Sequence, residues 1–353
     1  MKRVIFVAHL QSHIRNFHIP YLKHLKEKGY YVAVATRVDN IGELNFLDKV
    51  IDIPFTRSPF SFKVFSNYKL LSKEFEEGAY DIIHCHTPVA GVLTRIAAKK
   101  LRPNVKVYYT AHGFHFYKGA PLINWMIYYP AELYCARFTD VLFTINKEDF
   151  NLAKEKFKHT NVQLLSGVGV NTRCNNIVKN HDQKNINLLS VGELNKNKNH
   201  IIVLKALKEI NNPNIHYYIA GEGNQKEKLL NYAKANGLEQ NLHLLGFVKP
   251  VSNALQQKDI FVFPSIREGL SLALMEAMAY ELPCIVSNIR GNNELIDPQG
   301  GYLVKEFSEY VNAIDSLVSS RKKRQTFGEY NKRKVQRYAY DIVEKELDKF
   351  YEI

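Results

Sequence analysis

The chain has 353 residues, of which 46% are hydrophobic and 24% charged, a composition that can fill globular cores and excludes a largely disordered protein. Lys and Arg number 48 against 35 Asp and Glu, and the formal charge of +13 favours acidic partners such as nucleotide phosphates, nucleic acid or an anionic membrane. No run of 18 apolar residues occurs, which argues against a membrane-spanning helix, and four cysteines without a CxxC pair indicate reduced thiols in a cytosolic protein.

The first half of the chain alternates short apolar runs with amphipathic segments. The runs are RVIFVA (3–8), YVAVAT (31–36), DIIHCH (81–86), KVYYTAH (106–112) and VLFTIN (141–146). Most are followed by a segment with helical periodicity, such as IPYLKHLKEKG after the first run. Near-continuous apolar strands separated by helices are typical of a parallel sheet covered on both faces. We therefore predict an α/β domain over residues 1–168.

The same alternation restarts at residue 185, with the runs INLLSVG, IHYYIAG, LHLLGF, DIFVFPS and PCIVS. The preceding segment, LLSGVGVNTRCNNIVKNHDQKN, is rich in Gly and Asn, and we predict a linker over 169–184. We predict a second α/β domain over 185–337 and a C-terminal helix over 338–353 that packs back on the first domain. The simplest architecture is two Rossmann-like, doubly wound domains facing a central cleft. Ligands of such sheets bind beyond the carboxyl ends of the strands.

The segment FPSIREGLSLALMEAMA contains an apolar strand, a loop and a helix that carry two acids. Ser271 is placed to cap a helix that begins at Leu272, and Gly269 allows close backbone approach. The helix N-terminus suits a phosphate, with Glu268 beside it. Glu276 lies more than a turn deeper, where a carboxylate can accept hydrogen bonds from two ribose hydroxyls. Alternatively, Glu276 is a buried acid satisfied within the protein and Glu268 is a surface residue.

Two further strand ends in the second half carry polar loops. In SVGELNKNKNH, Lys196 and Lys198 precede a helix that begins at Ile201, and a lysine there could hold a diphosphate as a point charge. The alternative is a solvated loop. In IAGEGNQKEKL, Gly221 and Gly223 follow a strand, but this pair is too short for a dinucleotide-binding fingerprint.

In the first half, a strand ends at His112-Gly113, and His115 follows. A histidine in such a position is either structural or catalytic. Two segments combine basic and aromatic residues, as a surface that lies on an anionic membrane would. They are RSPFSFKVFSNYKLL (57–71), with Arg57, Phe60, Phe62, Lys63 and Phe65, and residues 122–129, with Trp125, Tyr128 and Tyr129 near Lys118. Alternatively, these aromatics belong to the core.

A basic stretch near the end of the chain, RKKRQTFGEYNKRKVQRY, could be a nucleic-acid patch or a solvated helix face. It is one segment with few aromatics, and no helix-turn-helix or RNA-binding motif stands beside it. We therefore predict a solvated helix and no nucleic-acid partner.

Taken together, the motifs resemble the retaining GT-B glycosyltransferases of family 4. The segment FVFPSIREGLSLALMEAMAYELPCIVSNIRGNNELI matches the family's E-x7-E element with Glu268 and Glu276, and VGELNKNKNH, IAGEGNQKEKL and LGFVKP follow the family's order. In the first half, FHIPYLKHLKEKGYYV, RSPFS, YDIIHCHTPVAGVLTRIAA and TAHGFHFYKGAPLINWMIYYPAE resemble members that build bacterial capsular and extracellular (biofilm) polysaccharides. The resemblance covers nearly the whole chain and implies the GT-B fold.

The resemblance implies roles for individual residues. Glu276 holds the nucleotide ribose, Lys198 neutralises the donor diphosphate, and His112 lies beneath the donor sugar near its anomeric carbon. Glu268 contacts the sugar hydroxyls. The remaining donor-side residues are Gly269, Leu270 and Ser271 around the phosphate, Gly221 after a strand, and Val248 by the base.

The chain departs from the family pattern at two places. The family has an arginine after the glycine that is Gly192 here, whereas this chain has Glu193, for which Arg267 or Lys196 could compensate. The glycine-rich loop that many members carry after the first strand is replaced by HLQSHIRNFH. Three histidines of the first half are therefore only acceptor-side candidates, namely His13, His18 and His115.

The implied activity is transfer of a sugar from a nucleotide-sugar, a UDP-sugar such as a UDP-N-acetylhexosamine by analogy, to a polyprenyl-diphosphate-linked glycan. No DxD-like acidic pair is placed to hold a metal, so we expect metal-independent chemistry without a cofactor. The expected location is the inner face of the plasma membrane, with peripheral attachment. The alternatives are a GT-B nucleotide-sugar epimerase and, less well supported, a nucleic-acid-binding protein.

Overall fold

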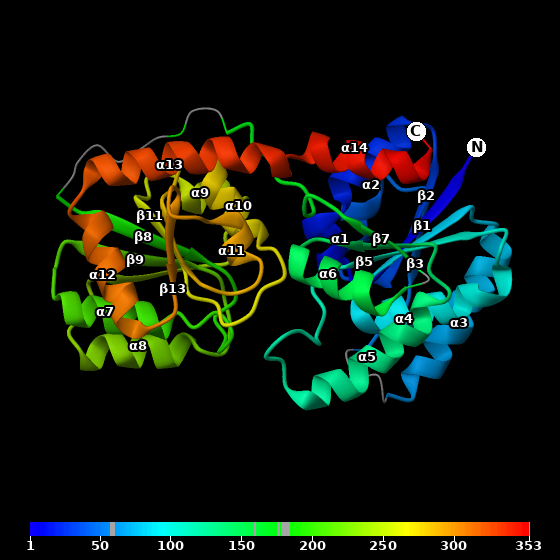
Figure 1. The fold of residues 1–353 in the computed structure, drawn as a ribbon, viewed down its shortest axis with the longest axis horizontal. Coiled ribbons are helices and arrows are strands. Elements are labelled where there is room, and N and C mark those ends of the chain that lie inside the picture. The colour runs from blue at the N-terminus through cyan, green and yellow to red at the C-terminus, as the bar shows by residue number, and fades with distance from the viewer. Residues whose placement is uncertain (57–60, 159, 175–176, 178–183, 353) are drawn as a thin grey trace. The chain divides into compact units, whose positions relative to one another are not determined.

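The computed structural model of the protein describes residues 1–56, 61–158, 160–174, 177 and 184–352. The chain divides into two compact units (Figure 1). Unit 1 comprises Met1–Gly169 with Tyr340–Ile353, and unit 2 comprises Val170–Ala339. Half of the linker predicted over 169–184, namely 175–176 and 178–183, lies outside the described residues.

Unit 1 is built on a parallel sheet of seven strands in the order β3-β2-β1-β4-β5-β6-β7. The strands are β1 (Arg3–Leu10), β2 (Tyr31–Arg37), β3 (Lys49–Asp52), β4 (Ile82–His86), β5 (Lys106–Ala111), β6 (Val141–Thr144) and β7 (Asn161–Leu164). The helices are α1 (Gln11–Phe17), α2 (Ile19–Glu27), α3 (Lys63–Gly78), α4 (Pro88–Ala98), α5 (Leu122–Ala136), α6 (Lys147–Lys156) and α14 (Tyr340–Tyr351).

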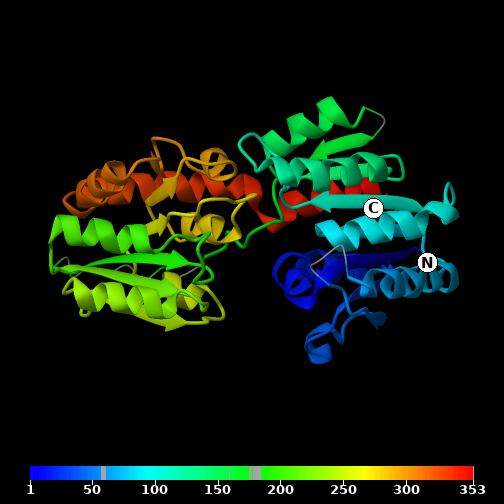
Figure 2. The same cartoon turned by 90° about the horizontal axis from the view of Figure 1, so that it is seen from below.

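Helices cover both faces of this sheet (Figure 1 and Figure 2). Successive residues of β1 contribute to different cores: Ile5 and Val7 pack in one cluster, while Val4 and Phe6 pack in the other. Because side chains of a strand alternate between faces, this division explains why the strand is apolar throughout.

Helix α14 returns the C-terminus to unit 1. Its apolar face, which includes Val343, Leu347 and Tyr351, joins the cluster that contains Val4 and Phe6. The Tyr351 hydroxyl lies 2.6 Å from Nδ1 of His84, and the Tyr108 hydroxyl donates to the Phe350 carbonyl at 2.7 Å. The last helix is therefore part of the core of unit 1.

Unit 2 repeats the plan with a parallel sheet of six strands in the order β10-β9-β8-β11-β12-β13. The strands are β8 (Ile186–Val191), β9 (Ile215–Ala220), β10 (Leu242–Gly246), β11 (Ile260–Phe263), β12 (Cys284–Ser287) and β13 (Gly301–Val304). The helices are α7 (Ile201–Ile210), α8 (Lys226–Ala235), α9 (Ser252–Leu255), α10 (Leu272–Ala279), α11 (Asn292–Leu295), α12 (Phe307–Val318) and α13 (Arg321–Val335).

The prediction of two doubly wound α/β domains is confirmed, and so is each strand predicted from an apolar run. The sequence analysis missed β3, β7 and β13, which are edge strands of four residues each. The basic stretch predicted as a solvated helix forms α13, of which Arg324 is buried and donates to the carbonyls of Leu317 and Val318.

Each sheet has a switch point, where the strand order reverses direction. In unit 1 it lies between β1 and β4, and in unit 2 between β8 and β11. Ligands of open parallel sheets bind in the crevice outside the carboxyl ends of the strands at such points. The loops that leave these four strands are therefore the places to look for chemistry.

Candidate active site

In unit 2, the loop that leaves β11 leads directly into α10. Ser271 is the N-cap residue of α10, and its Oγ accepts a hydrogen bond from the Leu274 amide at 3.3 Å, as predicted. Gly291, which follows β12, packs closely against this loop. Its φ is +80°, and a Cβ there would lie 2.0 Å from the Gly269 carbonyl oxygen, so only glycine fits. The positive end of the helix dipole at Ser271 favours an anion.

Lys198, from the loop that leaves β8, reaches the same place. Its Nζ lies 2.7 Å from a carboxylate oxygen of Glu268, and the two side chains are 18% and 15% exposed. The ammonium also lies 4.5 Å from the ring centroid of Phe263. Gly192 leaves room for the lysine stem, because a Cβ there would lie 2.9 Å from Lys198 Cε. The fold thus holds a cation and an anion at the start of α10.

Glu276 lies in the second turn of α10 and is partly buried. Burial raises the pKa of this carboxyl group from an ordinary value of 4.5 to about 7. A carboxyl group with this pKa changes charge near neutral pH, and a ligand that donates hydrogen bonds to the carboxylate will favour its ionised form. A perturbed carboxyl group beside a helix N-terminus is typical of a functional site.

Four other residues predicted for the donor side lie on neighbouring loops. Gly221 packs against the loop that leaves β8, because a Cβ there would lie 1.9 Å from the Gly192 carbonyl oxygen. Val248 is partly buried, and the adjacent Phe247 is 71% exposed. Glu193 is exposed, and its carboxylate accepts a hydrogen bond from Nδ2 of Asn195 at 3.0 Å. Across the described parts of the chain, no ion pair joins Glu193 to Arg267 or Lys196, which are both exposed.

The sequence analysis missed a second cation in this region. Arg290 follows β12, is 9% exposed, and donates from Nε to the Glu268 carbonyl at 3.3 Å. It thereby contacts the backbone of the loop whose Glu268 side chain pairs with Lys198. The available signal was an arginine followed by glycine shortly after a strand, in SNIRGNNEL.

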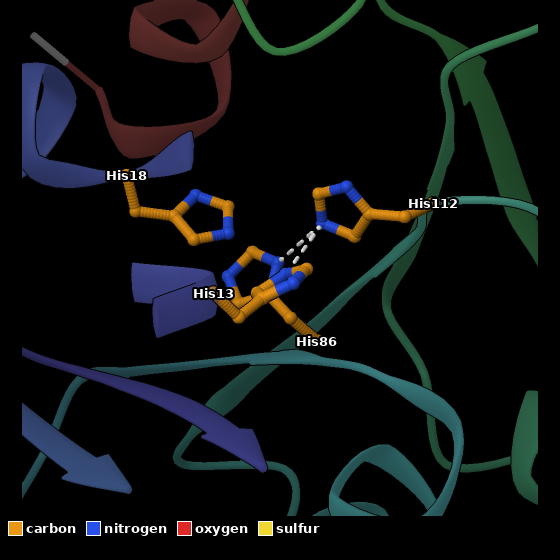
Figure 3. Close-up of side chains that lie close together, drawn as sticks. All are labelled: His13, His18, His86 and His112. Atoms are coloured by element: carbon orange, nitrogen blue, oxygen red, sulfur yellow. Dashed lines mark hydrogen bonds between the residues drawn. The ribbon is translucent and has the colours of Figure 1, made fainter. Parts of the chain in front are cut away.

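In unit 1, histidines gather where the chain leaves β1, β4 and β5. His86 is the last residue of β4, His112 follows β5, His13 is in α1, and His18 separates α1 from α2. Nε2 of His112 lies 3.2 Å from Nε2 of His13 and 3.4 Å from Nδ1 of His86 (Figure 3). One ligand atom from each ring falls within 4.8 Å of the others. We call these residues the four-histidine cluster.

In the four-histidine cluster, His18 and His86 are buried, whereas His13 and His112 are partly exposed. Burial lowers the pKa of all four imidazoles, that of His112 to about 4, and the neighbouring histidines lower those of His13, His18 and His86 further. The rings are therefore uncharged at neutral pH. The sequence analysis missed His86 because DIIHCH has the composition of a buried strand. His115 is not part of the cluster, and its ring stacks on Tyr128 at 4.5 Å.

The aromatic residues predicted to form a membrane surface divide into two groups. Phe62 is 100% exposed and Phe65 65% exposed, beside the exposed Lys63. On α5, by contrast, Trp125, Tyr128 and Tyr129 are partly buried and pack against the core of unit 1, as the alternative held, and a membrane role for them stays a prediction. The apolar residues that α5 exposes include Leu122, Ile123 and Met126. Arg57 and Phe60 lie outside the described residues. Among the described residues, no helix is both long and apolar enough to cross a membrane.

Two family models match the chain. The model described as glycosyl transferases group 1 matches residues 175–334, and the model described as glycosyl transferase 4-like matches residues 3–146. EpsD of Bacillus subtilis strain 168, whose description as a glycosyltransferase is itself provisional, is 34% identical over 99% of this chain and 96% of its own length. The chain belongs to the group 1 glycosyltransferases.

Other relatives of this glycosyltransferase share the fold and, in part, the sequence. A UDP-Gal:alpha-D-GlcNAc-diphosphoundecaprenol alpha-1,3-galactosyltransferase of Escherichia coli is 34% identical over 72% of this chain and 68% of its own length. Among solved structures, Anabaena Alr3699/HepE in complex with UDP and glucose covers 100% of both chains with a TM-score of 0.79 and 15% identity. The structural likeness confirms the GT-B fold. Neither the family nor these relatives support the epimerase or the nucleic-acid-binding alternative.

Proposed function

We propose that this glycosyltransferase moves a sugar from a UDP-sugar to a polyprenyl-diphosphate-linked glycan in capsule or exopolysaccharide assembly, with retention of the anomeric configuration. The observation that carries the proposal is the arrangement at the start of α10. There, Lys198 and Glu268 lie 2.7 Å apart beside the Ser271 cap, with Glu276 one turn further along the helix. This combination offers a cation and a helix N-terminus for the diphosphate, and a carboxylate that can accept hydrogen bonds from the ribose hydroxyls.

In the proposed reaction, the bond between the anomeric carbon and the β-phosphate oxygen breaks, and its electron pair stays on the diphosphate. Lys198 and the amides at the start of α10 stabilise this charge, so the proposed chemistry requires no metal at the diphosphate. The acceptor hydroxyl bonds to the anomeric carbon on the same face, and its proton passes to the leaving phosphate. Following the family resemblance, we assign His112 to the sugar and Glu276 to the ribose.

The Lys198–Glu268 contact has a consequence for this scheme. When the diphosphate arrives, Lys198 gains a second anionic partner, and Glu268 becomes available to the sugar hydroxyls. The family's arginine is replaced by Glu193, and Arg290 is the buried cation nearest to the loop that carries Glu268. We propose that Arg290, rather than the exposed Arg267 or Lys196, supplies the second positive charge. Phe247, exposed beside Val248, is placed to stack on the base.

The acceptor proposal rests on a different kind of support. The Escherichia coli relative acts, by its name, on a diphosphoundecaprenol-linked sugar. Other relatives are named for amylovoran and O-antigen biosynthesis. A polyprenyl chain stays in its membrane, so the enzyme must reach the membrane surface. The exposed Phe62 and Phe65 beside Lys63 offer the apolar and basic groups that peripheral binding needs.

The proposal is tested by a thermal-shift screen of the full chain against UDP-, GDP- and ADP-sugars, followed by a transfer assay. We expect UDP-sugars to raise the unfolding temperature, because a ligand at about 100 times its dissociation constant adds roughly 2.7 kcal/mol of stability. The stabilising sugar is then incubated with a polyprenyl-diphosphate glycan, and NMR of the product reports the anomeric configuration. Stabilisation by GDP- or ADP-sugars alone, or an inverted product, would contradict the proposal.

A further inference from the structure

We propose that the four-histidine cluster of unit 1 is a binding site for one divalent transition-metal ion of the Zn²⁺ class. The cluster lies at the carboxyl ends of β4 and β5 and in α1 and the residue that follows it, all within unit 1. The donor-side residues Lys198, Glu268 and Glu276 belong to unit 2, so this site is separate from the diphosphate chemistry proposed above.

The separations of the ring nitrogens fit such an ion. Zn²⁺ bound by imidazole at about 2.0–2.1 Å in a tetrahedron places its ligand atoms about 3.3–3.4 Å apart. The separations from His112 Nε2 to His13 Nε2 and to His86 Nδ1 are 3.2 and 3.4 Å. All four rings offer an atom within 4.8 Å of the others, so small side-chain rotations complete the set. Figure 3 shows the rings converging from different segments of unit 1.

One member of the cluster has a buried nitrogen that needs a partner. Nε2 of His18 is buried and takes part in no hydrogen bond within the described chain, and the residue is only 7% exposed. Buried polar atoms in folded proteins nearly always have a partner. His18, His86 and His112 also line a cavity of about 30 Å³, which has room for a single ion or water.

The chemistry of the ligands selects the class of metal. Four imidazoles and no carboxylate suit Zn²⁺, Cu²⁺ or Ni²⁺, whereas Mg²⁺ and Ca²⁺ prefer oxygen ligands. Of these ions, Zn²⁺ has the strongest preference for a closed tetrahedral site, which makes it the expected occupant. A bound ion would also connect β4, β5 and the α1–α2 segment, which stabilises unit 1.

Occupancy has a consequence for catalysis that rests on the proposed function. His112 cannot hold a metal ion with Nε2 and at the same time present that nitrogen to a donor sugar. The bound ion therefore inhibits sugar transfer, and removing the ion restores the activity. The unmodified protein should be active in a chelator, and added Zn²⁺ should lower turnover without weakening UDP binding in unit 2.

The binding claim is tested on the purified full chain, stripped by chelation and titrated with Zn²⁺ in a calorimeter and with Co²⁺ in a spectrophotometer. We expect one ion per chain and the intense visible bands of four-coordinate Co²⁺. His86→Ala and, separately, His13→Ala should each lower affinity more than the about 10–100-fold that is typical of losing an outer-shell partner. His13 is only partly buried, so its variant keeps the test valid should His86→Ala fail to fold.

The matched control is the His216→Ala/His243→Ala variant. These two histidines lie 3.1 Å apart on the sheet of unit 2 and are the obvious adventitious site. The control should bind Zn²⁺ as the wild-type protein does. Loss of binding in the control, retention of binding in His13→Ala, or Co²⁺ bands typical of six-coordination would each overturn the proposal. If Zn²⁺ binds at the cluster while transfer continues undiminished, the metal site stands and the assignment of His112 to the sugar falls.

Discussion

The two switch points of the molecule have the same topology and opposite chemistry. In unit 2, the loops that leave β8 and β11 bring together a lysine, two glutamates and a helix N-terminus, all suited to a charged ligand. In unit 1, a histidine at the end of β4 and another directly after β5 meet two more from α1 and the α1–α2 junction, and burial keeps all four uncharged at neutral pH.

This difference shows how one fold can supply two kinds of site. A parallel sheet fixes only where the strand ends meet, and the loop residues decide what binds there. In the charged site, Lys198 and Glu268 are already paired with each other. The imidazole site has buried nitrogens without a hydrogen-bond partner among the described residues. If the two sites have separate roles, substitutions in one should leave the ligand of the other unaffected.

The largest expected effect on activity follows from removing the ammonium group of Lys198. Lys198→Ala should lower kcat/KM for the UDP-sugar by about 10²–10³-fold, because the charge that develops on the diphosphate loses its main counterion. Lys196→Ala is the matched control, since Lys196 is exposed on the same loop, and it should change kcat/KM by no more than about twofold. Rates measured over a range of donor concentrations distinguish the two variants. Equal losses would show that Lys198 is not the diphosphate residue.

Glu276 offers a way to separate nucleotide binding from stability. Glu276→Gln should weaken UDP binding by about 1–3 kcal/mol, because one acceptor for the ribose is lost. The same variant should be more stable than the wild-type protein above pH 7. The pKa of Glu276 is raised from 4.5 to about 7, so the wild-type protein loses stability as the pH rises between these values, and glutamine does not titrate. Calorimetry and thermal unfolding at about pH 5 and about pH 8 test both statements. A variant that binds UDP normally would remove Glu276 from the donor site.

The exposed aromatics of unit 1 test whether membrane contact also belongs to one unit. Phe62→Ser/Phe65→Ser should weaken the free energy of binding to anionic vesicles by about 1–3 kcal/mol, measured by flotation, because both rings are exposed beside Lys63. Phe307→Ser in unit 2 removes an aromatic that is 39% exposed, and it should float like the wild-type protein. High salt should weaken binding of the wild-type protein. Equal flotation of all three proteins would mean that this surface does not contact the membrane.

The smallest effect concerns the cap of α10. Ser271→Ala should cost about 1 kcal/mol of unfolding free energy, because Ser271 caps α10, and it should also weaken UDP binding if the start of α10 holds the phosphate as proposed. Ser320→Ala removes an equivalent cap from α13, where Oγ accepts from the Lys323 amide at 3.3 Å. It should lower stability by a similar amount and leave UDP binding unchanged. If Ser271→Ala loses stability but binds UDP normally, Ser271 caps α10 without contributing to the phosphate site.

The sequence predicted the fold and the donor loop well because both depend on local pattern. Apolar runs with helices between them identify buried parallel strands, and a serine before LALMEAMA identifies a helix cap. It predicted the contacts of Arg290 and His86 poorly, because these are set by which loops meet in space. The short edge strands β3, β7 and β13 are less apolar and gave no clear signal. The burial of Trp125 on α5 was likewise a consequence of tertiary packing.

We infer that nucleotide recognition belongs to the unit 2 site alone. The most direct measurement is calorimetric titration of UDP into the wild-type protein, Glu276→Gln and His112→Ala under identical conditions. We expect one UDP per chain, an affinity reduced by about 5–150-fold in Glu276→Gln, and an unchanged affinity in His112→Ala. If His112→Ala weakens UDP binding as much as Glu276→Gln does, or if UDP fails to bind the wild-type protein, the claim is contradicted.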